Sequence, residues 1–308
     1  MVLTRAIVAA VGAVAVGATV GAASGQEREL DIDAGDTVLH VHAFGPANAP
    51  ETVLVVPGGP GLSHEYLLPL AALAGDKRSV FFYDARGSGR SGSSPDLGLD
   101  AQVLDLDAVR KASGATRVHV LGHSWGTVIA LAYARDFPER VASLVLVGMG
   151  APTAAADRKS FGAAFAARKA ALQKLGLVGG PPTAGRRGPA GDPATQDCMA
   201  SFNAVLPVHF ADPLHDAARR LPGSFRCGLQ ARAIAAAGAW DFRADLARLD
   251  QPILFLIGDT DANLAGMTES ARRARVGITV TLEACGHFPF LECPGEFFPA
   301  VERFLRAF

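Results

Sequence analysis

The chain has 308 residues, of which 49% are hydrophobic and 19% charged, and its formal net charge is -1. This length allows one large α/β domain or two ordinary domains, and the composition does not indicate disorder. The balanced charge predicts neither a basic surface for nucleic acid nor a polybasic membrane signal. We therefore expect a small molecule or a short peptide as the partner.

Residues 1–24 have the layout of a secretory signal peptide. Arg5 supplies one positive charge, residues 6–22 form a mostly Ala/Val/Gly run, and small residues follow at 21–24. This pattern predicts cleavage near Ala23 or Ser24 and a secreted or periplasmic protein with no stable membrane span after cleavage. The alternatives are an uncleaved segment that anchors the protein to the membrane and a buried apolar helix.

Strand-like and helix-like segments alternate along the remaining chain. The first two predicted strands alternate polar and apolar residues and indicate an antiparallel hairpin, whereas most later strands are continuously apolar and indicate a buried parallel sheet. The predicted strands cover residues 29–33, 37–44, 52–56, 79–83, 118–121, 141–147, 252–257 and 278–282. The predicted helices cover 62–74, 99–113, 125–135, 268–275 and 294–308. The fold class is therefore α/β, with a mostly parallel sheet and helices on both faces.

Residues 151–240 interrupt this alternation. They combine Ala-, Arg- and Lys-rich stretches with Gly/Pro-rich segments between 179 and 193. We interpret them as a helical cap, or lid, inserted after a central strand, with residues 25–150 and 241–308 forming the core.

Gly122-His123-Ser124-Trp125-Gly126 follows a short apolar run and begins an Ala-rich segment. This strand-to-helix context is the one that a nucleophile elbow requires, and the two glycines relieve crowding at the turn. Ser124 is therefore the predicted nucleophile.

An earlier strand ends in Pro57-Gly58-Gly59-Pro60-Gly61, where backbone N–H groups are expected to form an oxyanion hole. Pro60 has no N–H to donate. We predict Gly59 as one donor and Trp125, directly after the nucleophile, as the other.

An acid and a histidine follow later strands, in the chain order Ser, Asp, His. A serine needs a base to take its proton, and that base needs a carboxylate to hold its tautomer. His287 is the predicted base and Asp261 the predicted acid. Asp259, nearer the strand end, is the alternative acid.

The remaining histidines show no metal-ligand spacing, and no phosphate-binding loop is present in the sequence, so we predict neither metal nor cofactor. His64, just after the Gly/Pro-rich loop, is a candidate substrate contact, with a loop-shaping hydrogen bond as its alternative role. The four cysteines allow three pairings, of which we favour Cys198 with Cys227 and Cys285 with Cys293.

These motifs resemble the α/β-hydrolase superfamily and, within it, the proline iminopeptidase group of serine peptidases. The similarity rests on residues 57–67, 84–91, 122–126 and 286–287, and extends over about 30–150 and 245–308. It implies an α/β-hydrolase fold, the triad Ser124, Asp261 and His287, and an enzyme that releases N-terminal residues from small peptides through an acyl-enzyme.

The chain departs from that group in two places. Pro57 stands where the group usually has His, and no Glu lies between Glu139 and Glu269 to bind a substrate amino group from the cap. Asp197, Asp212 and Asp216 are the predicted replacements. The alternative functions are an esterase or lactonase acting on a small acyl compound and, at lower rank, a ligand-binding protein without catalysis.

Overall fold

The computed structural model describes residues 27–179 and 197–308. Within these residues eight strands form one sheet in the order β1-β2-β4-β3-β5-β6-β7-β8. The strands are β1 Arg28–Asp33, β2 Val38–Phe44, β3 Glu51–Val56, β4 Arg78–Tyr83, β5 Val118–His123, β6 Val141–Val147, β7 Ile253–Gly258 and β8 Gly277–Leu282. The predicted signal peptide and most of the predicted Gly/Pro-rich loop lie outside the described residues.

The sheet has an antiparallel edge and a parallel body, as predicted. β2 pairs antiparallel with both β1 and β4, whereas β3 to β8 pair in parallel. Alternate residues of β3 pack on opposite faces, because Leu54 and Val56 belong to one apolar core while Val53 and Val55 belong to the other. A strand buried on both faces is continuously apolar, which is why β3 lacks alternation.

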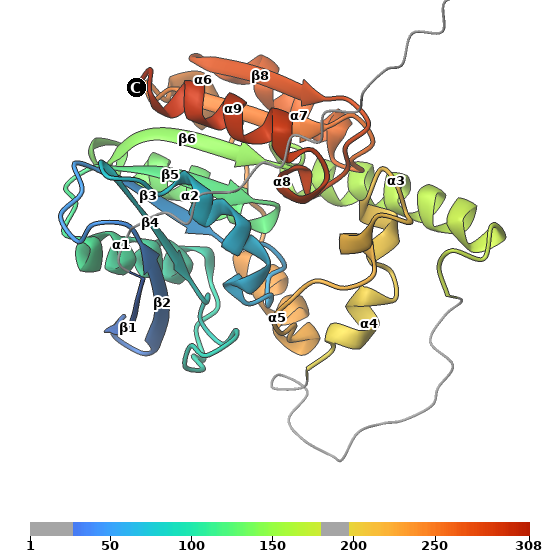
Figure 1. Cartoon of the computed structure of the whole chain (residues 1–308), viewed down its shortest axis with the longest axis horizontal. Helices are drawn as coiled ribbons and strands as arrows, with labels where there is room; N and C mark the ends of the chain where they lie inside the picture. Colours follow the sequence, from blue (N-terminus) through green and yellow to red (C-terminus); the bar gives the residue numbers. More distant parts are fainter. Residues whose placement is uncertain (1–26, 180–196) are drawn as a thin grey trace, which may run out of the picture.

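Helices cover both faces of the sheet (Figure 1). The first core includes residues of α1, α2, α6 and α7, and the second includes residues of η1, α8 and α9. Their bounds are η1 His64–Leu73, α1 Leu99–Ser113, α2 Trp125–Asp136, α6 Arg243–Arg248, α7 Leu264–Arg273, α8 Pro289–Glu292 and α9 Pro294–Leu305, with a short turn η2 at Pro138–Arg140.

Two helices differ from the sequence prediction. The segment predicted as a helix over 62–74 is the 3-10 helix η1, which carries Pro69, and proline disfavours continued α-helix. Helix α7 begins at Leu264, four residues before the predicted start. Asp261 and Asn263, just before its first turn, are polar residues typical of loops, so the sequence placed the helix start too late.

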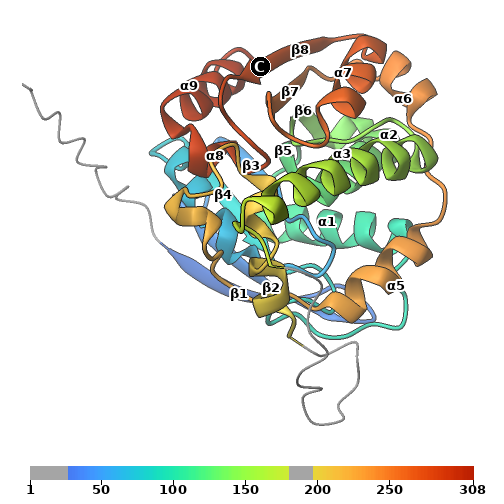
Figure 2. The same cartoon turned by 90° about the vertical axis from the view of Figure 1, so that its right-hand side faces the viewer.

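Most of the elements between β6 and β7 lie beyond the carboxyl ends of the parallel strands, and α3 faces the viewer in Figure 2. They are α3 Ala154–Lys174, α4 Met199–Asn203, η3 Leu206–His209, η4 Asp216–Ala218 and α5 Cys227–Ala237. This is the segment predicted as the cap, and its described residues are largely helical.

All four cysteines lie in the described residues, and both predicted pairings are confirmed. Cys198 bonds to Cys227 and Cys285 to Cys293, with Cα atoms 5.7 and 6.3 Å apart. In the described part of the chain, no helix combines the length and apolar character needed to cross a membrane.

Candidate active site

Ser124 lies at a sharp turn between β5 and α2. Its φ is 54°, a left-handed conformation that is costly for a residue with a side chain. The glycines on either side of the turn allow its backbone to pack closely. A Cβ at Gly122 would overlap backbone atoms of Gly126, and a Cβ at Gly126 would overlap the carbonyl oxygen of Val56. Close backbone packing therefore holds Ser124 at the edge of the cavity described below.

His287 and Asp261 form a buried pair. His287 Nδ1 lies 2.7 Å from Asp261 Oδ2, and the two side chains are 5% and 1% exposed. Asp261 Oδ1 accepts a hydrogen bond from the N–H of Asn263, which fixes the carboxylate. Burial alone would lower the pKa of His287, but the charge and hydrogen bond of Asp261 raise it above its ordinary value.

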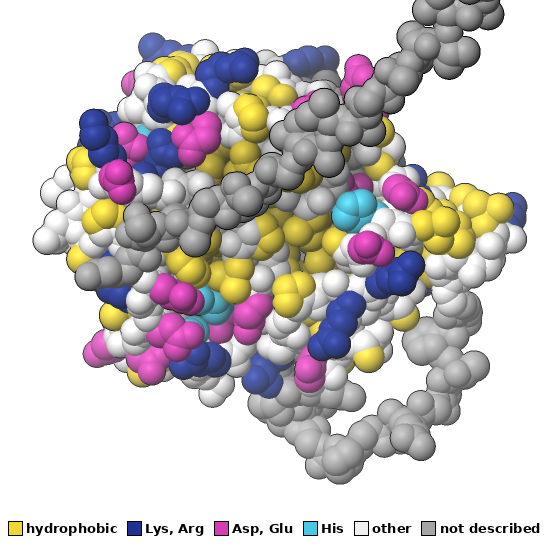
Figure 3. Space-filling view, viewed as in Figure 1, with side chains coloured by type: hydrophobic (Ala, Val, Ile, Leu, Met, Phe, Trp, Pro, Cys, Tyr) yellow, Lys and Arg dark blue, Asp and Glu magenta, His cyan; other side chains and the backbone are white. Residues whose placement is uncertain are grey.

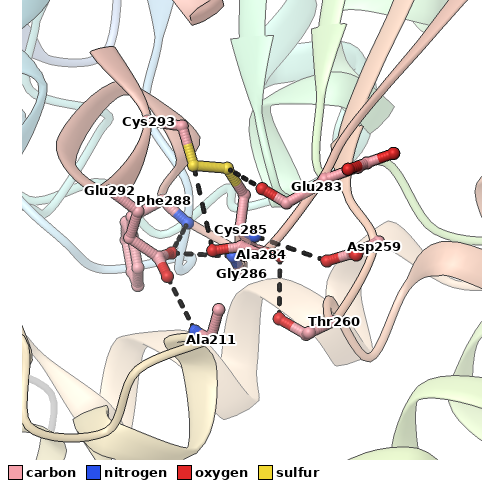
Figure 4. The surroundings of a disulfide bond; sticks show 10 residues. All are labelled: Ala211, Asp259, Thr260, Glu283, Ala284, Cys285, Gly286, Phe288, Glu292 and Cys293. Carbon is pink, nitrogen blue, oxygen red and sulfur yellow. Dashed lines mark hydrogen bonds between the residues drawn. A yellow bond between two sulfur atoms is a disulfide. The ribbon is translucent and has the colours of Figure 1, made fainter. Parts of the chain in front are cut away.

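Asp259 has a different environment. It is exposed, and its Oδ1 accepts a hydrogen bond of 3.3 Å from the N–H of Cys285. Figure 4 shows it beside the Cys285 loop, together with Thr260, whose hydroxyl donates to Cys285 O at 2.7 Å. Of the two aspartates, Asp261 contacts His287 and Asp259 shapes the loop before it.

Glu292 fastens the loop that carries His287 (Figure 4). Its Oε1 accepts from the N–H groups of Gly286 and Phe288, at 3.0 and 3.4 Å, and its Oε2 accepts from Ala211 at 2.7 Å. Burial raises the pKa of the Glu292 carboxyl above its usual value, although the three hydrogen bonds that it accepts act to lower this pKa. Because Ala211 belongs to the segment between β6 and β7, Glu292 couples that segment to the His287 loop.

The Gly/Pro-rich loop after β3 forms one wall of the site. Gly59 has φ of 115° and lines the cavity, while the Gly58 N–H is already committed to the Tyr66 hydroxyl at 2.7 Å. The N–H of Trp125 is the first in α2 and so has no acceptor within the helix. Both predicted donors, Gly59 and Trp125, therefore border the same cavity as Ser124.

A buried hydrogen-bond chain connects these parts. The Tyr66 hydroxyl lies 3.0 Å from His123 Nδ1, and His123 Nε2 lies 2.9 Å from the carbonyl oxygen of His287. That carbonyl can only accept, so His123 Nε2 donates and its Nδ1 accepts from Tyr66. Burial keeps the pKa of His123 well below its usual value, so the ring stays neutral. The chain of bonds thus joins the Gly58 loop to the His287 loop.

We expect Tyr66→Phe to lower kcat about tenfold, because the buried Gly58 N–H and His123 Nδ1 would both lose their partner. Steady-state kinetics of the folded variant measures this effect. Tyr83→Phe is the matched control, since the Tyr83 hydroxyl is buried and has no hydrogen-bond partner among the described residues. Equal kcat in both variants would contradict a role for this hydrogen-bond chain.

The site opens into a cavity of about 580 Å³. Its wall is mainly aromatic and aliphatic. The segment between β6 and β7 supplies much of this wall, including the disulfide-bonded residues Cys198 and Cys227. His209 also lines it, with ring centroids 5.3 Å from His287, and burial lowers the pKa of His209 to about 3. The aromatic members of the wall are Trp125, Phe161, Phe165, Phe202, Phe225, Trp240, Phe242 and Phe288.

Four predicted substrate contacts lie elsewhere. None of His64, Asp197, Asp212 and Asp216 lines the cavity. Asp197 accepts from the N–H groups of Met199 and Phe225, Asp212 accepts from Leu214, and Asp216 is almost fully exposed. Asp197 and Asp212 thus shape turns in the segment between β6 and β7, and Asp216 faces solvent.

The carboxylate that the sequence prediction missed is Asp157. Among the described residues lining the cavity it is the one acid. It lies in the first turn of α3 and accepts a hydrogen bond of 3.0 Å from Ala151 N, and burial raises its pKa. The signal that could have identified Asp157 was its position shortly after the central strand β6. The prediction considered only acids farther along the chain, beginning at Asp197.

Comparison with known proteins identifies the fold. A family model described as alpha/beta hydrolase fold matches residues 51–180. The crystal structure of a proline iminopeptidase-related protein from Thermus thermophilus superimposes with a TM-score of 0.68 at 25% identity, covering 92% of this chain and 98% of that one. The chain has the α/β-hydrolase fold. An esterase from Exiguobacterium antarcticum shares this α/β-hydrolase fold, with a TM-score of 0.67, 19% identity, and coverage of 91% and 100%.

Sequence similarity is concentrated in part of this α/β-hydrolase chain. A proline iminopeptidase of Heyndrickxia coagulans is 42% identical over 112 residues, which are 35% of this chain and 38% of that relative's length. The resemblance to the proline iminopeptidase group is thus supported over less than half of the relative. The family model includes Gly59 and Ser124 but ends before Asp261 and His287, so the pairing of these two residues, and the place of His287 in the cavity wall, rest on the geometry alone.

Proposed function

We propose that this chain is a serine hydrolase that works through an acyl-enzyme, with Ser124 as nucleophile, His287 as base and Asp261 as the acid that orients it. The observation that carries the proposal is that His287, paired with the buried Asp261, lines the same cavity as Ser124. The left-handed backbone of Ser124 adds support, since such strain clusters at functional sites.

In the proposed reaction, Ser124 Oγ attacks the carbonyl carbon of the substrate while its proton passes to His287 Nε2. The N–H groups of Gly59 and Trp125 stabilise the oxyanion. The carbonyl re-forms as the bond to the leaving amine or alcohol breaks, and His287 gives that group the proton. Water then repeats the sequence on the acyl-enzyme, releasing the acid and regenerating Ser124.

The proposed substrate is a small peptide with a free N-terminus, as in the proline iminopeptidases that the chain resembles. The favouring observation is Asp157, whose carboxylate reaches the cavity and can bind a protonated amine. The second candidate is a small ester or lactone. It is favoured by the aromatic wall and by the shared fold with an esterase.

An amide and an ester of matched size separate the two candidates. We expect the wild-type protein to cleave a prolyl arylamide, and blocking the amine to abolish that cleavage. A p-nitrophenyl ester cleaved alone, with the arylamide untouched, would favour the esterase and contradict the peptidase.

Asp157→Asn should raise KM for the prolyl arylamide by about tenfold to a hundredfold, because a charge-assisted hydrogen bond to the amine is lost. Hydrolysis of the p-nitrophenyl ester, which has no amine, should stay near wild type. Asp212→Asn, an exposed aspartate outside the cavity, is the control and should change neither substrate. A uniform loss on both substrates in Asp157→Asn would assign Asp157 to structure.

The pH profile follows from the state of His287. The imidazole must be neutral to accept the Ser124 proton, and Asp261 raises its pKa above the ordinary 6.5. We expect kcat/KM to fall as the pH drops through that raised pKa, giving an acid limb with its midpoint above 6.5. A midpoint well below the ordinary value would contradict the pairing.

We also propose that the protein acts outside the reducing cytoplasm. Two disulfides among the described residues support this, because such bonds persist in oxidising compartments.

A further inference from the structure

The loop that carries Gly59 contacts the segment between β6 and β7 at close range. An antiparallel bridge pairs Leu62 with Phe225. The N–H of Arg226 donates to Gly61 O at 3.0 Å, and a Cβ at Gly61 would lie only 2.7 Å from Arg226 O. The two stretches of backbone therefore approach so closely that a side chain at Gly61 would collide with the segment.

Further hydrogen bonds and apolar packing extend this contact. The Ser63 N–H donates to Ser224 O at 3.0 Å, and the Ser224 N–H donates to Ser63 Oγ at 2.8 Å. Leu62 and Phe225 both belong to the second apolar core. Figure 3 shows hydrophobic side chains near the middle of this face of the molecule, beside the region where Figure 1 draws α4 and α5. The segment is thus both bonded to the loop and packed against it.

Gln230, near the start of α5, reaches the residue proposed as an oxyanion donor. Its Nε2 donates to Gly59 O at 3.0 Å, and Gln230 lines the cavity. The carbonyl of Gly59 belongs to the peptide unit that follows this residue, whereas its N–H belongs to the unit before it. Gln230 therefore fixes the peptide unit next to the one that supplies the donor.

Hydrogen bonds flank this donor peptide on both sides. The peptide unit before it is fixed through the Gly58 N–H, which donates to the Tyr66 hydroxyl at 2.7 Å. The unit after it is fixed through Gly59 O by Gln230. Glycine restricts its own backbone rotation least of all residues. The direction of the Gly59 N–H is therefore set by these two bonds rather than by side chains at Gly58 and Gly59.

We propose that Gln230 is a positioning residue for the oxyanion hole, which holds the Gly59 N–H in the direction of the substrate carbonyl. The inference rests on the proposed serine hydrolase function, since the oxyanion forms only in that reaction. A donor of this kind contributes about a hundredfold to a thousandfold in kcat, and only when it is preorganised. Gln230 lies 171 residues beyond Gly59, so only the fold brings the two together.

The test is Gln230→Met, which keeps the length of the side chain and removes its N–H donors. We expect kcat and kcat/KM to fall equally, by about tenfold to a hundredfold, with KM unchanged. The factor should be the same for the prolyl arylamide and the p-nitrophenyl ester, because both reactions pass through an oxyanion. Labelling of Ser124 by a fluorophosphonate should slow by that factor too. Gln230→Glu, whose ionised carboxylate cannot donate, should lose at least as much.

Gln173→Met is the matched control. Gln173 Nε2 likewise donates to a glycine carbonyl, Gly179 O, at 3.0 Å, but this bond is exposed and Gln173 does not line the cavity. This variant should keep the kcat and labelling rate of wild type, and the Tm of each variant checks its folding.

A Gln230→Met protein that takes up the label at the wild-type rate would overturn the inference. A higher KM for one substrate alone would also overturn it, because Gln230 would then be a substrate contact. If the wild-type protein itself took up no label, the proposed function would fail and the inference with it.

Discussion

Ser124→Ala should lower kcat about a million-fold, because the remaining oxyanion donors and binding contacts cannot replace a nucleophile. Alanine keeps the Cβ of serine, so the strained turn between β5 and α2 is the same in both proteins. The loss should therefore appear in kcat with no change in Tm. Hydrolysis of the prolyl arylamide and the p-nitrophenyl ester, followed to long times, measures it.

Ser201→Ala is the matched control, since Ser201 lines the same cavity from α4 and has no assigned role in the reaction. It should keep kcat within a few-fold of wild type. If Ser124→Ala retained substantial turnover while Ser201→Ala lost it, the nucleophile would be misassigned.

The second large effect is expected for Asp261→Asn, which should lower kcat about ten-thousand-fold. The amide would donate its N–H to His287 Nδ1 and so leave the proton on Nε2, where the imidazole cannot accept from Ser124. The acid limb of kcat/KM should also move to lower pH, because the charge that raises the His287 pKa is gone. Steady-state kinetics over pH measures both changes.

Asp259→Asn provides the comparison at a neighbouring acid. Its carboxylate is exposed and accepts only a long hydrogen bond from Cys285, so the substitution should cost no more than a few-fold. The opposite ranking, with Asp259→Asn the more damaging, would contradict the assignment of Asp261.

Much of the fold was predictable because its signals are local. Apolar runs such as Val53 to Val56 predicted buried strands, and the glycines around Ser124 predicted the sharp turn. Chain order alone placed an acid and a histidine after later strands, and the structure brings Asp261 to His287.

The wall of the site was less predictable because it is assembled from distant segments. The predicted substrate contacts Asp197, Asp212 and Asp216 do not line the cavity, and their carboxylates are held in turns or exposed. Asp157 reaches the cavity because α3 begins just beyond β6. No pattern in the sequence predicts the direction in which α3 runs from the end of β6.

Glu292 and Tyr66 were missed for a similar reason. They contact the site through hydrogen bonds to backbone atoms, which residue types alone do not reveal.

The central claim, that Ser124 is an activated nucleophile, is tested most directly by mapping a fluorophosphonate adduct. Wild-type protein should take up one label per chain, and mass spectrometry of the digested protein should place it on Ser124. Labelling should vanish in Ser124→Ala and survive in Ser201→Ala. No adduct on the folded wild-type protein, or an adduct on another residue, would contradict the claim.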